Sequence, residues 1–251
     1  MNIKEKLLTP NNYSRPQRNL TDVLGFVVHW VGNPKSTAIA NRNYFEGLKD
    51  SQDRYASAHY IIGLDGEIIQ CLPENEMAYH VGSENYTDQA LKLLSSYPNN
   101  CTLAIECCHL DWDGKMTDET YQSLIELATY LCDKYNKNSE NLWLHYDITW
   151  KDCHRWFVNN PDEWKKFKDK IDNYLKEVDD MAEQMSKYFV DITEKHDWDG
   201  NGEAVSNVDW LHEQGLISGV GNDKFAPDRS PTRYELAQVM YRIIEYIEGN
   251  Q

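Results

Sequence analysis

The sequence contains no long apolar run, no Cys-x-x-Cys pair and no excess of basic residues, and each absence excludes a class of protein. Because no 18 consecutive apolar residues occur, no membrane-spanning helix is expected, and the first ten residues lack the apolar stretch of an export signal. The missing Cys-x-x-Cys excludes zinc fingers, thioredoxin-like redox sites and c-type haem attachment. A formal net charge of −16, from 25 Lys and Arg against 41 Asp and Glu, argues against nucleic acid as a partner.

The amino-acid composition is that of a globular protein. The 251 residues are 41% hydrophobic and 12% aromatic, and a chain of this length buries roughly 70–75% of its unfolded surface. Six cysteines make an even count, but their irregular spacing and the missing export signal favour free thiols over disulfides. We expect most of them to be small core residues.

The acidic charge is uneven along the chain, which indicates two domains. Residues 1–175 carry a net charge of −7, whereas the much shorter segment 176–251 carries −9. We expect a first domain over 1–175, a connector over 176–187 that is acidic and has apolar residues at helical spacing, and a second domain over 188–251.

Hydrophobic patterning predicts an α/β fold for the first domain. Apolar, β-rich runs at 25–31, 101–108 and 142–146 indicate buried strands, and 58–62 and 67–72 flank a turn sequence typical of a hairpin. Helical periodicity begins at Thr117 and again at Pro161. The pattern predicts a mixed central β-sheet flanked by helices, followed by a small, mostly α-helical C-terminal domain.

Three polar residues, His29, Glu106 and His145, interrupt otherwise apolar strands. One interpretation is that each is an internally hydrogen-bonded core residue, because an unsatisfied buried polar group costs about 1–3 kcal/mol. The other interpretation includes Cys153, eight positions after His145. Two imidazoles and a thiolate make three ligands, the number with which a catalytic zinc site leaves a fourth position open. Glu106 could then transfer a proton and Lys151 could stabilise an oxyanion.

Four segments that contain these residues resemble the type 2 N-acetylmuramoyl-L-alanine amidases, which include phage endolysins, autolysins and the related peptidoglycan recognition proteins. The segments are GFVVHW (25–30), ASAHYIIGLDGEIIQCLPENEMAYHVGSENY (56–86), TLAIECC (102–108) and LHYDITWKDC (144–153). The resemblance implies the amidase fold and a Zn²⁺ cofactor bound by His29, His145 and Cys153. It also implies that Glu106 is the general base and acid, and that Lys151 supports the tetrahedral intermediate.

The resemblance extends to the substrate groove. His80 lies in a segment that such amidases use to line the groove, and we count Tyr60, in the hairpin, as a second candidate substrate-binding residue with core packing as its alternative. His154 stands where many relatives have proline, and we consider it a less favoured competing ligand. Cys153 itself favours an enzyme, because recognition proteins without this ligand have lost hydrolysis.

The C-terminal segment resembles a single S-layer homology repeat, in residues 189–192, 210–219, 225–227 and 231–237. This resemblance implies binding to secondary cell-wall polymers. Such repeats usually occur as three in tandem, so a homo-oligomer assembled through the tail is one way to restore multivalency. Residues 197–202 match the opening of an EF-hand calcium loop, but Val208 occupies position 12, and we expect an acidic surface loop.

Together the residues and the resemblances predict a peptidoglycan hydrolase of the endolysin kind, whose partner is bacterial peptidoglycan and not a membrane. We expect it to cleave the amide between N-acetylmuramic acid and L-alanine, and to remain in the host cytoplasm until it is released to the cell wall. The alternatives are a bacterial autolysin, a muropeptide-recycling amidase and, from another class, a non-catalytic peptidoglycan-binding module.

Overall fold

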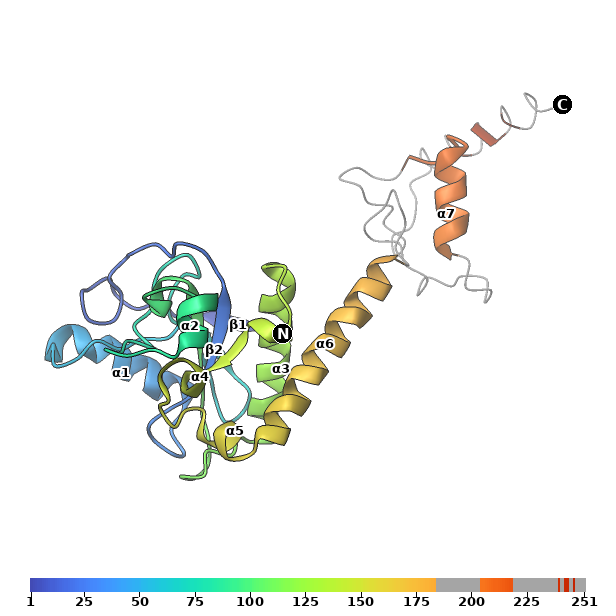
Figure 1. Cartoon of the computed structure of the whole chain (residues 1–251). Coiled ribbons are helices and arrows are strands. Elements are labelled where there is room, and N and C mark those ends of the chain that lie inside the picture. The colour runs from blue at the N-terminus through green and yellow to red at the C-terminus, as the bar shows by residue number, and fades with distance from the viewer. Residues whose placement is uncertain (184–203, 219–238, 240–241, 244–245, 247–251) are drawn as a thin grey trace. The chain divides into compact units, whose positions relative to one another are not determined.

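A computed structural model gives the structure of the chain and describes residues 1–183, 204–218, 239, 242–243 and 246 (Figure 1). The chain divides into two units, Met1–Leu175 and Lys176–Gln251. No helix in the described ranges is both long enough and apolar enough to cross a membrane.

The first unit is built on a six-stranded sheet with the strand order β1-β4-β3-β5-β2-β6. Strands β3, β5, β2 and β6 are parallel, β4 runs antiparallel to β3, and β1 is parallel to β4, which confirms the predicted mixed sheet and hairpin. The strands are β1 (Ile3–Glu5), β2 (Gly25–Trp30), β3 (Tyr60–Ile62), β4 (Ile68–Gln70), β5 (Thr102–Cys107) and β6 (Leu142–Leu144).

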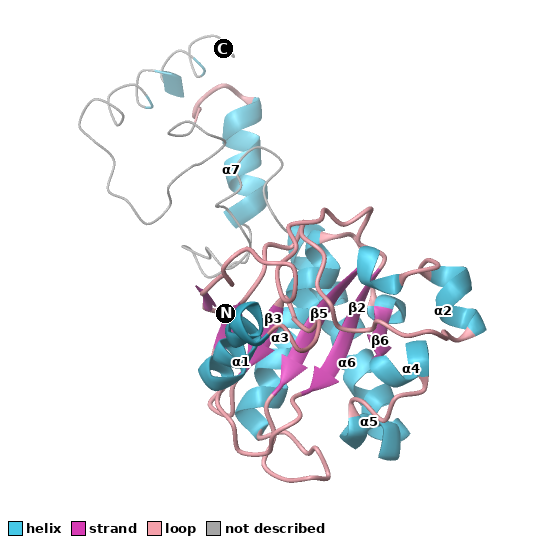
Figure 2. Cartoon of the chain, turned by 90° about the vertical axis from the view of Figure 1, so that its left-hand side faces the viewer, coloured by secondary structure: helices cyan, strands magenta, loops and turns pink. Residues whose placement is uncertain are grey.

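Helices cover both faces of this sheet. The α-helices are α1 (Ala38–Ser51), α2 (Asp88–Leu93), α3 (Asp118–Lys134), α4 (His145–Thr149), α5 (Arg155–Asn159), α6 (Pro161–Glu183) and, in the second unit, α7 (Ala204–Glu213). Two short 3-10 helices, η1 (Pro98–Asn100) and η2 (Ser139–Asn141), precede β5 and β6. Figure 2 shows β3, β5, β2 and β6 side by side, with α1 on one side of the sheet and α3 and α6 on the other.

The alternation of side chains along the strands creates two cores. Phe26 and Val28 of β2 join Leu103 and Ile105 of β5 in a buried cluster with α3 and α6. Ala104 of β5 belongs to the other core, which packs against α1. His29 is in register with Glu106 on the face that also carries Ala104, so both polar side chains lie on the α1 side of the sheet.

The prediction of a strand over 142–146 is wrong in its last two residues. Strand β6 ends at Leu144, and His145 begins the short helix α4. Asp147 accepts a hydrogen bond from the Leu144 backbone N–H at 2.8 Å, which caps the helix start, and Trp150 ends it in the left-handed region at a φ of 60°. The capping bond turns the chain at His145 and starts a helix there.

The second unit contains α7, which is consistent with the α-helical C-terminal domain expected there. Val208 and Ile217 are buried together, with Leu211 and Val239 packed against them. Gly215 follows the helix with a φ of +70°, a conformation that favours glycine. Helix α6 continues through Lys176 to Glu183, so the first part of the expected connector is helical. The expected elements at 189–192, 225–227 and 231–237, the acidic loop 197–202 and residues 184–187 lie outside the described residues.

Candidate metal centre

Three buried side chains, His29, His145 and Cys153, converge beside the carboxyl ends of β2 and β6. The Nδ1 atoms of His29 and His145 are 3.2 Å apart, and the Cys153 Sγ lies 3.5 Å from Nδ1 of His29. All three donor atoms lie within 4.8 Å of one another. In the described part of the chain this is the one group of three or more His, Cys, Asp or Glu side chains arranged to hold a metal ion.

These distances fit a tetrahedral zinc site. With Zn–N bonds of about 2.0–2.1 Å and a Zn–S bond of about 2.3 Å, neighbouring ligand atoms stand roughly 3.4 Å apart for two nitrogens and 3.6 Å for nitrogen and sulfur. The observed 3.2 Å and 3.5 Å are close to these values. Three protein donors leave the fourth tetrahedral position for a water molecule or a substrate oxygen, as catalytic sites require.

Local structure explains why the three residues meet. His29 is the fifth residue of β2, and His145 directly follows β6, the parallel neighbour of β2, so both lie at the same edge of the sheet. The Tyr146 N–H donates to the Cys153 carbonyl at 2.7 Å, which returns the chain after α4 to the point where that helix began. Ligand sites in open α/β sheets lie at this carboxyl edge.

The protonation states at the centre suit a metal ligand set. Burial lowers the pKa of His145 to about 3 and the pKa of His29 well below its usual range, so both imidazoles are neutral and able to donate a lone pair. Burial raises the pKa of the Cys153 thiol, which favours the protonated form. A coordinating divalent cation reverses that preference, because it binds the thiolate and compensates its buried charge.

Glu106 is the ionisable group beside the triad on β5. One of its oxygens, Oε2, is buried without a hydrogen-bond partner. Burial raises the pKa of Glu106 to about 8, and the positive charge of Lys151 opposes this shift. An unpartnered carboxyl with a pKa near neutrality is suited to accept and release a proton at physiological pH.

The triad, Glu106 and Lys151 all line one cavity of about 1730 Å³. A cluster of three tyrosines contributes to its wall. Tyr55 stacks on Tyr13 at a ring-centroid distance of 5.1 Å and meets Tyr79 edge-on at 5.2 Å. Tyr55 is 61% exposed, and Tyr55 and Tyr79 both face the cavity. The chemical centre therefore lies in a cavity large enough for an extended substrate.

The two expected substrate-binding residues occupy different places. Tyr60 does not line the cavity: it is 1% exposed, and its hydroxyl donates to Glu74 at 2.6 Å. Tyr60 is in register with Ile105, so it faces the core beneath α3, opposite to Glu106. His80 does line the cavity, but both of its ring nitrogens already have partners, His29 and Thr102.

His154, the competing ligand considered above, is not part of the metal-ligand group. Its ring is fully buried against Phe157, at a centroid distance of 5.0 Å, and neither ring nitrogen has a hydrogen-bond partner. Burial lowers the pKa of His154 to about 3, which keeps the ring neutral in this apolar position.

Sequence reasoning missed Thr102 and Tyr55. Thr102 is the first residue of β5 and contacts His80. A threonine at the start of a strand carries no sequence signal for contact with a histidine that lines a cavity. Tyr55 directly precedes the segment quoted for the resemblance and follows the polar pair Asp53-Arg54, and all three line the cavity. A charged and aromatic stretch between a helix and a strand was the available signal.

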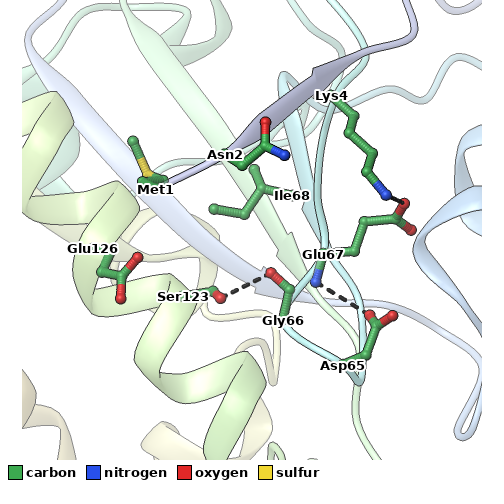
Figure 3. Close-up of a pocket in the computed structure, with 9 residues that line it drawn as sticks. All are labelled: Met1, Asn2, Lys4, Asp65, Gly66, Glu67, Ile68, Ser123 and Glu126. Carbon is green, nitrogen blue, oxygen red and sulfur yellow. Dashed lines mark hydrogen bonds and ion pairs between the residues drawn. The ribbon is translucent and has the colours of Figure 1, made fainter.

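A second, smaller hollow of about 320 Å³ lies where β1 meets the turn before β4 (Figure 3). Its polar groups are largely occupied with one another: Lys4 pairs with Glu67 at 2.8 Å, and the Ser123 hydroxyl donates to the Gly66 carbonyl at 2.8 Å. It contains no histidine or cysteine and lies apart from the triad. We assign no chemistry to it.

A family of known proteins matches the part of the chain that contains the candidate site. Residues 19–156 match the Amidase_2 family model, described as N-acetylmuramoyl-L-alanine amidase, and this match covers more than half of the chain. The chain belongs to this amidase family. The matched range includes all three candidate ligands, Glu106 and Lys151.

Similar proteins are known from Bacillus licheniformis. A probable N-acetylmuramoyl-L-alanine amidase is 33% identical over 165 residues, which cover 66% of this chain and 46% of the relative. The amidase CwlL is 29% identical over 234 residues, 91% of this chain and 62% of CwlL. The solved catalytic domain of XlyA aligns with a TM-score of 0.54 and 26% identity, covering 68% of this chain and 99% of that domain. The chain therefore spans about half to three fifths of the curated relatives' length.

Proposed function

We propose that this protein is a zinc-dependent N-acetylmuramoyl-L-alanine amidase, which hydrolyses the amide between the lactyl group of N-acetylmuramic acid and L-alanine in peptidoglycan. The observation that carries the proposal is the buried triad of His29, His145 and Cys153 with Glu106 on the same face of the sheet. Family membership supports it, because the matched model and the relatives are named as amidases for this bond.

In this proposal His29, His145 and Cys153 hold the zinc ion. When bound, zinc polarises the scissile carbonyl and lowers the pKa of a water molecule, so that water can attack near neutral pH. Buried neutral imidazoles and a thiolate suit this ion, and the cavity next to them gives an extended substrate access.

Glu106 carries the proton. As the water oxygen forms its bond to the carbonyl carbon, the Glu106 carboxylate takes the proton, and it then delivers that proton to the departing alanine nitrogen as the amide bond breaks. The products are a lactyl carboxylate and a free amine. The pKa near 8 that burial gives Glu106 lies within reach of both transfers, and a bound cation lowers it toward the ionised form.

Lys151 stabilises the negative charge that develops on the carbonyl oxygen. It lines the same cavity. Its positive charge contributes to lowering the pKa values of four neighbouring groups, which are His29, His145, Glu106 and Cys153. A fixed cation that meets charge only in the transition state accelerates the reaction without tightening substrate binding.

We propose that the enzyme acts as a phage-type endolysin, and that the segment from residue 188 onward holds it on the wall through the S-layer homology-like repeat. The solved catalytic domain of XlyA matches 68% of this chain, and the chain divides into two units after Leu175, which supports a separate catalytic unit. Because both wall polymers and the tail are anionic, binding by the tail would rest on specific contacts and persist at high salt.

Digestion of purified peptidoglycan by the zinc-loaded protein tests the reaction. We expect new N-terminal L-alanine without new reducing sugar ends, and we expect a chelator to abolish the release and added zinc to restore it. New reducing ends in place of alanine would contradict the amidase proposal. Binding to the walls without any release would favour a peptidoglycan-binding module.

A further inference from the structure

The ring of His29 has a second contact, on the side away from the other ligands. Its Nδ1 faces His145 and Cys153, whereas its Nε2 lies 3.0 Å from Nδ1 of His80. The two rings meet edge-on, with centroids 5.2 Å apart and planes at 85°. One nitrogen of His29 is thus directed to the metal site, and the other to His80.

His80 is held in place by its own contacts. Its Nε2 lies 3.1 Å from the hydroxyl oxygen of Thr102, and that hydroxyl donates to the carbonyl of Pro98 at 2.7 Å. The backbone N–H groups of His80 and Val81 donate to the side-chain oxygen of Asn99, at 3.2 Å and 2.9 Å. Both the ring and the backbone of His80 are therefore fixed against the segment that leads into β5.

The direction of this chain of hydrogen bonds follows from its last member. The Pro98 carbonyl can only accept, so it uses the Thr102 hydroxyl hydrogen, and the Thr102 oxygen is left to accept from Nε2–H of His80. His80 then has no proton on Nδ1, which accepts from Nε2–H of His29. With its proton on Nε2, His29 presents an unprotonated Nδ1 to the metal site.

We propose that His80 and Thr102 are positioning residues for the metal centre, which fix the ring orientation and the tautomer of His29 through this one-directional chain. The inference rests on the proposed zinc site and deepens it. It gives His80 a role other than the expected contact with substrate, because neither ring nitrogen of His80 is left for a ligand. Partners of this kind behind a metal-bound histidine typically account for about 10- to 100-fold in metal affinity.

The first test uses Thr102, whose side chain is fully buried. Thr102→Val keeps the shape but removes the hydroxyl, and we expect zinc affinity, measured by competition with a chromophoric chelator, to fall about tenfold. Thr102→Ser keeps the hydroxyl, and we expect it to retain the affinity within about twofold. Thr129→Val is the matched control, because the Thr129 hydroxyl is buried without a partner and far from this chain of bonds in sequence. We expect no change in its affinity.

The second test reads the tautomers directly and needs no variant. In the metal-free protein, long-range ¹H–¹⁵N NMR spectra should show the proton of both His29 and His80 on Nε2. A proton on Nδ1 of His80 would reverse the chain and overturn the proposal, as would equal zinc affinities of Thr102→Val, Thr102→Ser and the wild type. Should Thr102→Val fail to fold, the tautomers and His80→Ala, for which we expect a 10- to 100-fold loss of affinity, decide the matter.

These readouts separate this inference from the proposed function. A protein that binds zinc tightly, shows the expected tautomers and loses affinity in Thr102→Val, but releases no alanine, would support the positioning role and contradict the amidase proposal. Release of alanine together with unchanged affinity in both Thr102→Val and His80→Ala would contradict the positioning role alone.

Discussion

Nδ1 of His29 lies 3.2 Å from Nδ1 of His145, although 116 positions separate the two residues in the sequence. If both Nδ1 atoms lack a proton, as the proposed ligand set requires, they form no hydrogen bond and two lone pairs face each other. A cation between them removes that repulsion. The pair is the clearest structural support for the proposed metal site.

Removal of the sulfur ligand should abolish metal binding and hydrolysis together. Cys153→Ala deletes one of three protein donors, and we expect stoichiometric zinc to be lost at micromolar protein concentration, with wall lysis reduced to background. Cys132→Ala is the matched control, because Cys132 is equally buried but lies on α3 away from the cavity. Metal analysis and turbidity assays measure both effects. Hydrolysis by zinc-free Cys153→Ala would refute the site.

Glu106→Gln should separate chemistry from metal binding. The amide cannot carry a proton between water and the leaving nitrogen, so we expect kcat to fall by about 10²- to 10⁴-fold with zinc affinity unchanged. Glu126→Gln, at an exposed position on α3, is the control and should keep full activity. Full activity in Glu106→Gln would exclude Glu106 as the proton carrier.

The same substitution should stabilise the metal-free protein at alkaline pH. Burial raises the pKa of Glu106 to about 8 in the folded protein. Between the ordinary pKa of a glutamate and pH 8, the unfolded chain has therefore lost this proton while the folded protein keeps it, which favours unfolding as pH rises. Glutamine has no charge to bury, and we expect the free energy of unfolding of Glu106→Gln to exceed that of the wild type at pH 8, on the order of a few kcal/mol. At pH 4 the two should agree, because Glu106 is then protonated in both states. Denaturant unfolding at the two pH values measures the difference.

His59 should lower the stability of the fold in acid. It is fully buried, accepts from the Ala104 N–H on Nδ1 and donates to the Glu76 carbonyl on Nε2, and burial lowers its pKa to about 4. Its contribution is complete above pH 6.5, where the unfolded histidine is also neutral, and is lost as pH falls to about 4, amounting to about 3 kcal/mol. NMR titration of His59 tests this. A transition near pH 6.5 in the folded protein would contradict it.

Tyr55 should contribute to substrate binding more than to chemistry. It is exposed, lines the cavity and is supported on both sides by Tyr13 and Tyr79. We expect Tyr55→Ala to raise KM about 3- to 10-fold with kcat little changed, since an aromatic contact contributes about 0.5–1.5 kcal/mol. Tyr174→Ala, at an exposed position on α6 outside this cavity, is the control. A fall in kcat at constant KM would place Tyr55 in the reaction instead.

Much of the fold was predictable because its signals are local. Apolar runs mark β2 and β5, and the turn at Gly63–Gly66 marks the hairpin, so these elements follow from sequence. The end of β6 was not predictable from apolarity, because a capping bond from Leu144 to Asp147 decides where the strand stops. Hydrophobic periodicity cannot show a bond of that kind.

The candidate site divides in the same way. The candidate residues could be proposed from sequence because His29 and Glu106 are polar interruptions of apolar strands, and because the Cys153 thiol follows His145 by eight positions. The position of Tyr60 depends on strand register, which places it opposite to Glu106, and the partners of His80 depend on a loop packing against β5. Register and loop packing are set by long-range contacts, which local sequence patterns do not reveal.

Hydrolysis in water enriched in oxygen-18 identifies both the bond that breaks and the carbon that is attacked. The substrate is a muramoyl pentapeptide, and the zinc-loaded protein is compared with Cys153→Ala. The proposal predicts that mass spectrometry finds one heavy oxygen in the lactyl carboxylate of the muramic acid product and none in the peptide, whose L-alanine carries a free amine. Heavy oxygen in the peptide, or cleavage at a sugar linkage, would contradict it.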